Sequence, residues 1–226
     1  MKKLLLIVAS AVLITSNAFA GSWGIGAAGH IASVSAEGTE TTPSDTGTEN
    51  SVKSATAGNE FMFGSIFAEY SFGDSENFTF GIDYVPGAAD VNRKSLSRTD
   101  VTANAGEDNQ QDGTRSANAE LSDHITYYAE YGGMDSLYGK VGFAQVDVKT
   151  KDSSTSSGTV GLYPDKTLDA WTYGFGYKGG FGDNGYFKVE GYYTDYDNFS
   201  ATSSTSNTVS ADLDVVGAAL RLGYKF

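Results

Sequence analysis

The chain ends with the stretch DLDVVGAALRLGYKF, residues 212–226, in which apolar side chains recur at every second position. One side carries Phe226, Tyr224, Leu222, Leu220, Ala218 and Val216, and the other carries Lys225, Gly223, Arg221, Ala219 and Gly217. A period of two predicts a β-strand with one apolar face and one small or charged face. Soluble proteins seldom end on an apolar aromatic residue within such a strand, so the ending indicates a membrane β-barrel.

The composition of the chain agrees with a fold made of strands. The 226 residues include 28 Gly, 14 Tyr and 13 Phe but no Cys, and a Gly-rich and aromatic-rich chain favours β-structure. Without Cys, an exported protein has no disulfide framework. The formal net charge of −13 argues against nucleic acid or an anionic lipid surface as the main partner.

The first twenty residues have the pattern of a secretory signal peptide. Lys2 and Lys3 precede an apolar run, and Ala18 and Ala20 form the small-x-small pattern before a cleavage site after Ala20. The apolar run from Leu4 to Ile14 is 11 residues long, short of the ~20 residues that a membrane-spanning helix needs. We therefore expect a cleaved signal peptide over 1–20 and one barrel domain over 21–226, with 13 basic against 28 acidic residues and a charge of −15.

Seven further segments alternate in the same way as the terminal stretch. They are Trp23–Ile31, Asn59–Phe72, Phe78–Tyr84, Ile125–Tyr131, Leu137–Ala144, Trp171–Lys178 and Tyr186–Tyr193. Four long polar stretches, 37–57, 91–120, 151–166 and 198–208, alternate with three short turns at 73–77, 132–135 and 179–185. This rhythm predicts an all-β, eight-stranded antiparallel up-and-down transmembrane barrel with four long external loops and three short periplasmic turns. Ten strands remain an alternative if 91–120 contains a hairpin.

Charged residues within the cores of these segments share one face. They are Glu69, Asp83, Glu130, Lys140, Lys178, Lys188, Glu190 and Arg221, and all lie opposite the aromatic face. A charge on a lipid face costs ~2–4 kcal/mol near the midplane, so the charged face is expected to point into the lumen, the reverse of a soluble lipocalin-like barrel. Four acids and four bases in a narrow lumen predict a salt-bridged, largely closed network. A narrow pore for ions or small solutes is the alternative.

Residues suited to catalysis are few. The only histidines are His30 and His124, which we interpret as polar residues near the external strand ends. Ser122 and Asp123 adjoin His124, but consecutive strand residues point to opposite faces and cannot converge. The acidic residues lack EF-hand spacing. We therefore expect no enzyme, no cofactor and no metal site; a lipid A-modifying enzyme is the second alternative.

Taken together, the signal peptide, the strand rhythm and the ending resemble the small Gram-negative outer-membrane β-barrels of the OmpA/OmpX and opacity-protein type. The resemblance covers the mature chain and implies location in the bacterial outer membrane. It also implies that Leu220, Leu222, Tyr224 and Phe226 form the assembly signal read by the barrel-assembly machinery. The expected partners are outer-membrane lipid, that machinery and an external ligand bound by the loops. We expect a monomer without nucleic acid and without a periplasmic domain after the barrel, acting in surface interaction or envelope integrity.

Overall fold

The computed structural model describes residues 21–42, 51–73, 76–90, 96–102, 111–154, 163–203 and 208–226. The predicted signal peptide, with Ala18 and Ala20, lies outside the described residues. Nine strands are present in the described part: β1 (Gly21–Thr42), β2 (Ser51–Phe72), β3 (Phe78–Asp90), β4 (Leu96–Thr102), β5 (Gln111–Tyr131), β6 (Ser136–Ser154), β7 (Lys166–Phe181), β8 (Gly185–Thr202) and β9 (Thr208–Lys225).

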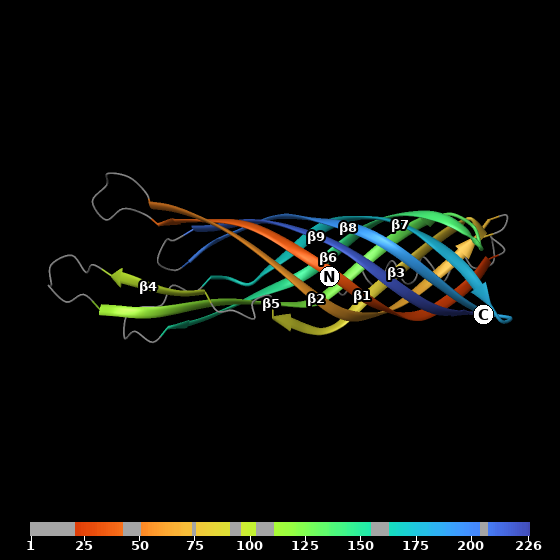
Figure 1. Cartoon of the computed structure of the whole chain (residues 1–226), viewed down its shortest axis with the longest axis horizontal. Coiled ribbons are helices and arrows are strands. Elements are labelled where there is room, and N and C mark those ends of the chain that lie inside the picture. Colours follow the sequence, from red (N-terminus) through yellow and green to blue (C-terminus); the bar gives the residue numbers. More distant parts are fainter. Residues whose placement is uncertain are drawn as a thin grey trace.

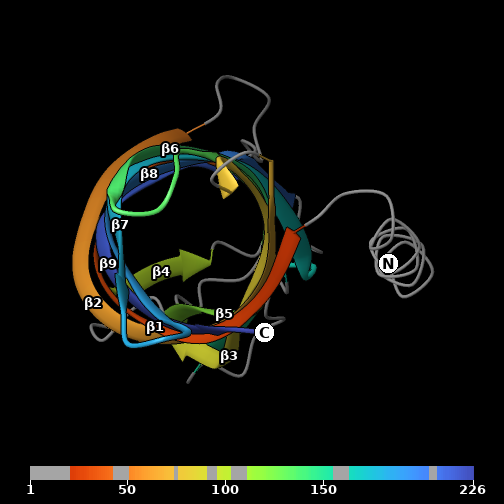
Figure 2. The same cartoon turned by 90° about the vertical axis from the view of Figure 1, so that its right-hand side faces the viewer.

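Eight of these strands close into an antiparallel barrel (Figure 2). The closing strand β9 pairs with β1 from Gly24 opposite Lys225 to Thr41 opposite Thr208, and β3 pairs with β5. Strand β4 pairs with the outer part of β5, Gln111–Ala117, beyond the β3–β5 pairing. The predicted eight-stranded barrel is confirmed, and the ten-strand alternative is wrong because β4 does not enter the wall.

The strands are much longer than the sequence pattern predicts. Residues 37–57 were expected to form a loop, yet β1 and β2 stay paired from Gly21 opposite Phe72 to Thr42 opposite Ser51. Strands also occupy parts of 91–120, 151–166 and 198–208, so all four loops are shorter than predicted. Figure 1 shows the long strands projecting at the end opposite the three short turns. Outside the bilayer both faces of a strand meet water, so backbone pairing continues where the hydropathy alternation stops.

The outward face of the barrel carries a belt of exposed apolar side chains next to the turn end. It includes Ile25, Ile31, Met62, Ile66, Phe80, Val141, Trp171, Phe175, Val189, Val216, Leu220, Leu222 and Phe226. On β9 the belt runs from Val216 to Phe226, which at ~3.4 Å per residue and a tilt of ~40° corresponds to about 25 Å along the barrel axis, the height of a lipid-facing band. Among the described residues, no helix is long and apolar enough to cross a membrane.

Candidate functional site

The interior of the barrel is divided along its axis, and its turn-side half is charged. All eight charged residues predicted to face the lumen are buried there. Lys140, Lys178, Lys188 and Arg221 come from the consecutive strands β6 to β9, whereas Glu69, Asp83 and Glu130 come from β2, β3 and β5. Bases and acids therefore occupy opposite walls, with Glu190 of β8 among the bases.

The first ion-paired group joins three residues across the lumen. The Lys188 Nζ lies 2.7 Å from a Glu69 carboxylate oxygen and 2.6 Å from a Glu130 carboxylate oxygen. The Tyr128 hydroxyl donates to the same Glu69 oxygen at 2.7 Å. Lys188 is completely buried, so its charge depends on these two carboxylates for compensation.

The second group joins four residues. The Arg221 guanidinium pairs with Asp83 at 2.5 Å and with Glu190 at 3.1 Å, and the Lys140 Nζ pairs with the same Glu190 oxygen. The Tyr138 hydroxyl donates to the other Glu190 oxygen at 2.7 Å. Glu190 is thus shared by two bases and a phenol, which satisfies both of its oxygens.

Lys178 is the exception among the eight. Its Nζ is buried and has no hydrogen-bond partner among the described residues, and it lies 5.6 Å from the centroid of the Tyr186 ring. It neighbours Lys188 in the β7–β8 register. The Glu69–Lys188–Glu130 group carries one excess negative charge when all its members are ionised, and Lys178 supplies the matching positive charge nearby.

Inward glycines make room for the tyrosine rings of this half. A Cβ at Gly81 would lie 2.2 Å from the Cζ of Tyr128, and a Cβ at Gly223 would lie 2.2 Å from the Cζ of Tyr186. Side chains at these positions would collide with the rings, because such contacts are far below van der Waals distance. Glycine on the charged face therefore allows bulky phenols to fill the narrow lumen.

The loop-side half of the interior is apolar. Val146, Val148, Leu168, Phe199 and Ala201 form a buried cluster, and a cavity of about 370 Å3 lies beside it. The cavity is lined by residues that include Phe61, Phe63, Leu121, Val146, Leu168, Tyr192, Leu213 and Val215. This apolar half was not among the sequence-based predictions, although Val146 and Val148 share the inward parity of Lys140 and Ala144.

His124 lines this cavity and His30 contacts its lining residues Phe63 and Tyr192, so both rings point into the barrel, which corrects their interpretation as loop-proximal residues. The His30 ring is buried, hydrogen-bonds to the Ser65 hydroxyl at 3.0 Å and stacks on Phe63 at 4.4 Å. The His124 Nε2 hydrogen-bonds to the Tyr196 hydroxyl at 3.0 Å. Both histidines occupy inward-facing positions of their strands, so their rings point into the barrel instead of towards the loops.

The adjacent Ser122 and Asp123 do not join His124 in a relay. The Ser122 Oγ is buried without a hydrogen-bond partner among the described residues, whereas Asp123 is exposed and accepts a hydrogen bond from Tyr84 at 3.4 Å. Within the described ranges, no group of three or more His, Asp or Glu side chains could hold a metal ion.

The barrel wall is irregular beside the cavity. The ladder between β2 and β3 ends at Ile66 opposite Tyr84, although both strands continue. Pro86 follows two residues later and has no backbone N–H to donate, and Gly87 adopts a left-handed φ of 95°. The β3–β5 register shifts at the same place, between Val85 and Ala88, as a β-bulge does.

The fold and its outer face define a small transmembrane β-barrel of the bacterial outer-membrane type. No protein-family model matches the chain, and no curated protein matches it in sequence. Among solved structures, the outer membrane protein OprG from Pseudomonas aeruginosa is 16% identical, with 92% of this chain and 97% of that chain covered and a TM-score of 0.44.

Two further solved structures are similar at the same distant level. Ail of Yersinia pestis, in complex with the heparin analogue sucrose octasulfate, is 14% identical with a TM-score of 0.38, and 91% of this chain and 97% of that chain are covered. Neisserial surface protein A is 11% identical with a TM-score of 0.32, covering 88% of this chain and 97% of that chain. Likeness at this level carries no argument about activity.

Proposed function

We propose that the protein is a closed, non-enzymatic barrel of the Gram-negative outer membrane that presents an acidic β-sheet rim to basic partners outside the cell. The rim is the part of β1, β8 and β9 beyond the lipid-facing belt. Strand β1 continues for 11 residues past Ile31, so the rim extends some 25 to 30 Å further along the axis at ~3.4 Å per residue and a tilt of ~40°.

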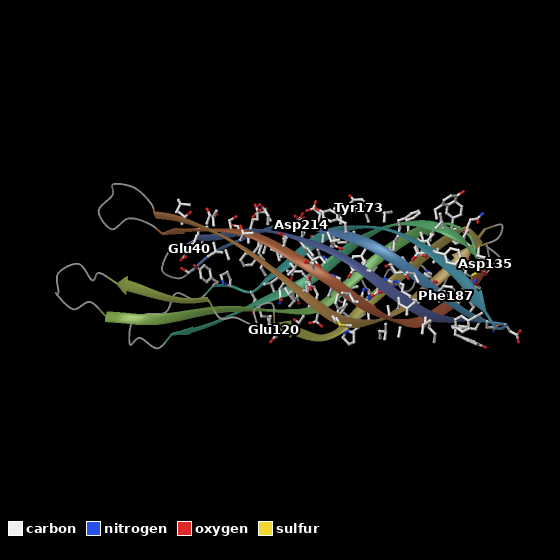
Figure 3. All side chains as sticks on the ribbon, viewed as in Figure 1. Glu40, Glu120, Asp135, Tyr173, Phe187 and Asp214 are labelled. Carbon is white, nitrogen blue, oxygen red and sulfur yellow. The ribbon has the colours of Figure 1, made fainter. Side chains whose placement is uncertain are left out.

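Five carboxylates on the rim carry the proposal. They are Glu37, Asp195, Asp197, Asp212 and Asp214, and residues 33–42, 195–203 and 208–215 contain no Lys or Arg. Figure 3 labels Asp214 on the outer side of the barrel and Glu40 nearer the loop end. Within the described residues, no base forms an ion pair with any of the five.

The register places these charges against one another. Glu37 lies directly opposite Asp212, and Asp195 lies directly opposite Asp214. Like charges directly opposite on an antiparallel pair are destabilising, so this arrangement contributes nothing to the sheet. A concentrated negative field does favour encounter with cationic partners, which supports a role in surface interaction.

The test compares binding of a fluorescent oligolysine peptide to the protein in vesicles of zwitterionic lipid. Asp195→Asn combined with Asp214→Asn should weaken binding by about threefold or more at low salt, because two carboxylates of the rim lose their charge. The matched control is Asp135→Asn combined with Asp183→Asn at the turn end, which should change binding by less than about twofold. Equal binding by the rim variant and the wild type would contradict the proposal.

A further inference from the structure

The apolar cavity in the loop-side half is not used by the acidic rim. Its lining contains no Asp, Glu, Lys or Arg. Its volume of about 370 Å3 falls within the range of small-molecule sites. At about 30 Å3 for each water-sized group, this space holds about twelve heavy atoms.

Side chains lie at both axial ends of the cavity. Towards the turns, His30 stacks on Phe63 and meets the edge of the Tyr192 ring at 5.8 Å. Beyond them the ion-paired groups fill the lumen, since Arg221 lies opposite Ala28, two residues from His30 on β1. Towards the loops lies the apolar cluster around Val148 and Phe199.

The lining of the cavity reaches the outer face of the wall between β2 and β3. The lining of the cavity includes Met62, Gly64 and Pro86, which are exposed on the outer face. If the β2–β3 ladder continued past Ile66 and Tyr84, Gly64 would face Pro86. Met62 lies opposite Ile31 of the lipid-facing belt, so this seam opens at the level of the outer leaflet.

Two hydroxyl groups mark the polar part of the site. The Ser122 Oγ and the Tyr192 Oη are buried and have no hydrogen-bond partner among the described residues, and both residues line the cavity. A buried hydroxyl without a partner is costly. A neutral hydroxyl or carbonyl group of a ligand would satisfy one of them, whereas a charged ligand would meet no countercharge from an Asp, Glu, Lys or Arg of the lining.

We propose that this cavity binds a small uncharged amphiphile, with an apolar body of about ten carbon atoms and one hydroxyl or carbonyl group, which enters from the outer leaflet through the β2–β3 seam. The apolar body contacts Val146, Leu168 and Val215. The polar group hydrogen-bonds to the hydroxyl of Ser122 or of Tyr192. Decanol represents this class. Decane is the counterpart without a polar group, and decanoate is the charged counterpart.

The experiment measures displacement of the fluorescent probe N-phenylnaphthylamine from the full chain in lipid nanodiscs, corrected for partitioning into empty nanodiscs. Decanol should displace the probe saturably and bind about threefold to tenfold more tightly than decane, the effect of one hydrogen bond. Decanoate should bind more weakly than either. Absence of saturable probe binding above the empty nanodiscs would overturn the proposal, as would equal binding of decanoate and decanol.

Two sets of variants test the site and its entrance. Tyr192→Phe combined with Ser122→Ala removes two unpartnered hydroxyls, so folding should be retained and the preference for decanol over decane should disappear. Ser33→Ala, an exposed serine of β1, is the control and should keep the preference. A preference unchanged in the double variant would show that the hydroxyls do not contact the ligand.

The entrance is tested with Gly64→Cys combined with Pro86→Cys in this cysteine-free chain. Bridging the two thiols with a short bismaleimide reagent should slow decanol binding at least about tenfold, because the seam can no longer widen. Gly64→Cys labelled with a monofunctional maleimide is the matched control. Unchanged binding rates after bridging would overturn entry through the seam.

Discussion

The two halves of the lumen differ in chemistry: the turn-side half is filled by ion pairs, whereas the loop-side half is apolar and contains a cavity. In the turn-side half, Lys188 and Glu190 each hold two oppositely charged partners across the lumen. In the loop-side half, Val146, Leu168 and their neighbours pack beside a cavity whose lining contains no Asp, Glu, Lys or Arg. A buried charge needs an oppositely charged partner at short distance, whereas apolar packing can leave an empty cavity at a cost in stability. The same barrel can therefore be sealed at one level and keep space for a ligand at another.

The largest effect should come from breaking an ion-paired group. Lys188→Met leaves Glu69 and Glu130 buried without their base, which should lower the free energy of unfolding by about 3–5 kcal/mol. Urea titration in lipid vesicles, followed by heat-modifiable electrophoretic migration, measures this. Lys149→Met, an exposed lysine of β6, should stay within about 0.5 kcal/mol of the wild type.

A rescue experiment sharpens this result. Adding Glu69→Gln and Glu130→Gln to Lys188→Met removes the uncompensated charges and should restore most of the lost stability. If Lys188→Met alone cost less than about 1 kcal/mol, the turn-side half would not depend on its ion pairs and the comparison between the halves would fail.

The loop-side half should respond to volume rather than charge. Leu168→Ala should lower the free energy of unfolding by about 2–3 kcal/mol, at the lower end for a buried leucine because a cavity already adjoins it. Leu168→Met keeps the volume and should cost less than about 1.5 kcal/mol. Equal losses for the two variants in the same titration would show that packing around Leu168 does not stabilise this half.

A smaller effect is expected where a glycine accommodates a phenol ring. Gly81→Ala places a methyl group against Tyr128, whose hydroxyl holds Glu69. We expect a loss of about 1–2 kcal/mol from overpacking. Gly139→Ala, where an added Cβ meets nothing within 4 Å, is the matched control. A stable Gly81→Ala variant would mean that the ring can shift without disturbing the ion pairs.

The smallest effect concerns pH and the turn between β2 and β3. Burial raises the pKa of Glu76, but hydrogen bonds from Lys225 and Ser22 and the positive charge of Lys225 outweigh it, so the net shift is downward. A carboxyl whose folded pKa is depressed stabilises the protein above its unfolded pKa and loses this contribution as the pH falls through its folded pKa. The effect should be less than about 1 kcal/mol for this partly exposed pair.

Glu76→Gln checks this prediction in urea titrations over an acidic pH series. The variant should lose less stability on acidification than the wild type. Asp183→Asn, at an exposed position in another turn, should follow the wild-type pH dependence. If Glu76→Gln and the wild type had the same pH dependence, the lowered pKa of Glu76 would not contribute to stability.

Period-two alternation was sufficient to predict the eight barrel strands and to separate inward from outward residues such as Lys188 and Val189. It did not predict the strand ends, because residues such as Thr39 and Ser54 meet water and leave no hydropathy pattern. It also could not predict which charges meet: Glu69 and Lys188 are 119 residues apart, and Lys178 forms no ion pair in the described part. Barrel closure and side-chain reach decide these contacts.

The seam shows a different limit of sequence reasoning. Pro86 and Gly87 are visible in the sequence as residues that disturb a strand, and they lie within the observed β3. The sequence does not show which of the two neighbouring strands stops pairing with β3 at this point. The register shows that pairing with β2 ends, whereas pairing with β5 continues. By contrast, Val34, Val146 and Val148 are apolar residues at inward-facing positions of their strands. This pattern is sufficient to predict an apolar interior in the loop-side half.

Planar-bilayer recording tests the closed turn-side half most directly. The purified full-length barrel in potassium chloride should give no reproducible single-channel steps at either voltage polarity, because two ion-paired groups cross the lumen. Arg221→Glu, which opposes Asp83 and Glu190 with a like charge, should introduce conductance. Steady channel steps in the wild type that vanish in Arg221→Glu would contradict the account and favour a narrow ion pore.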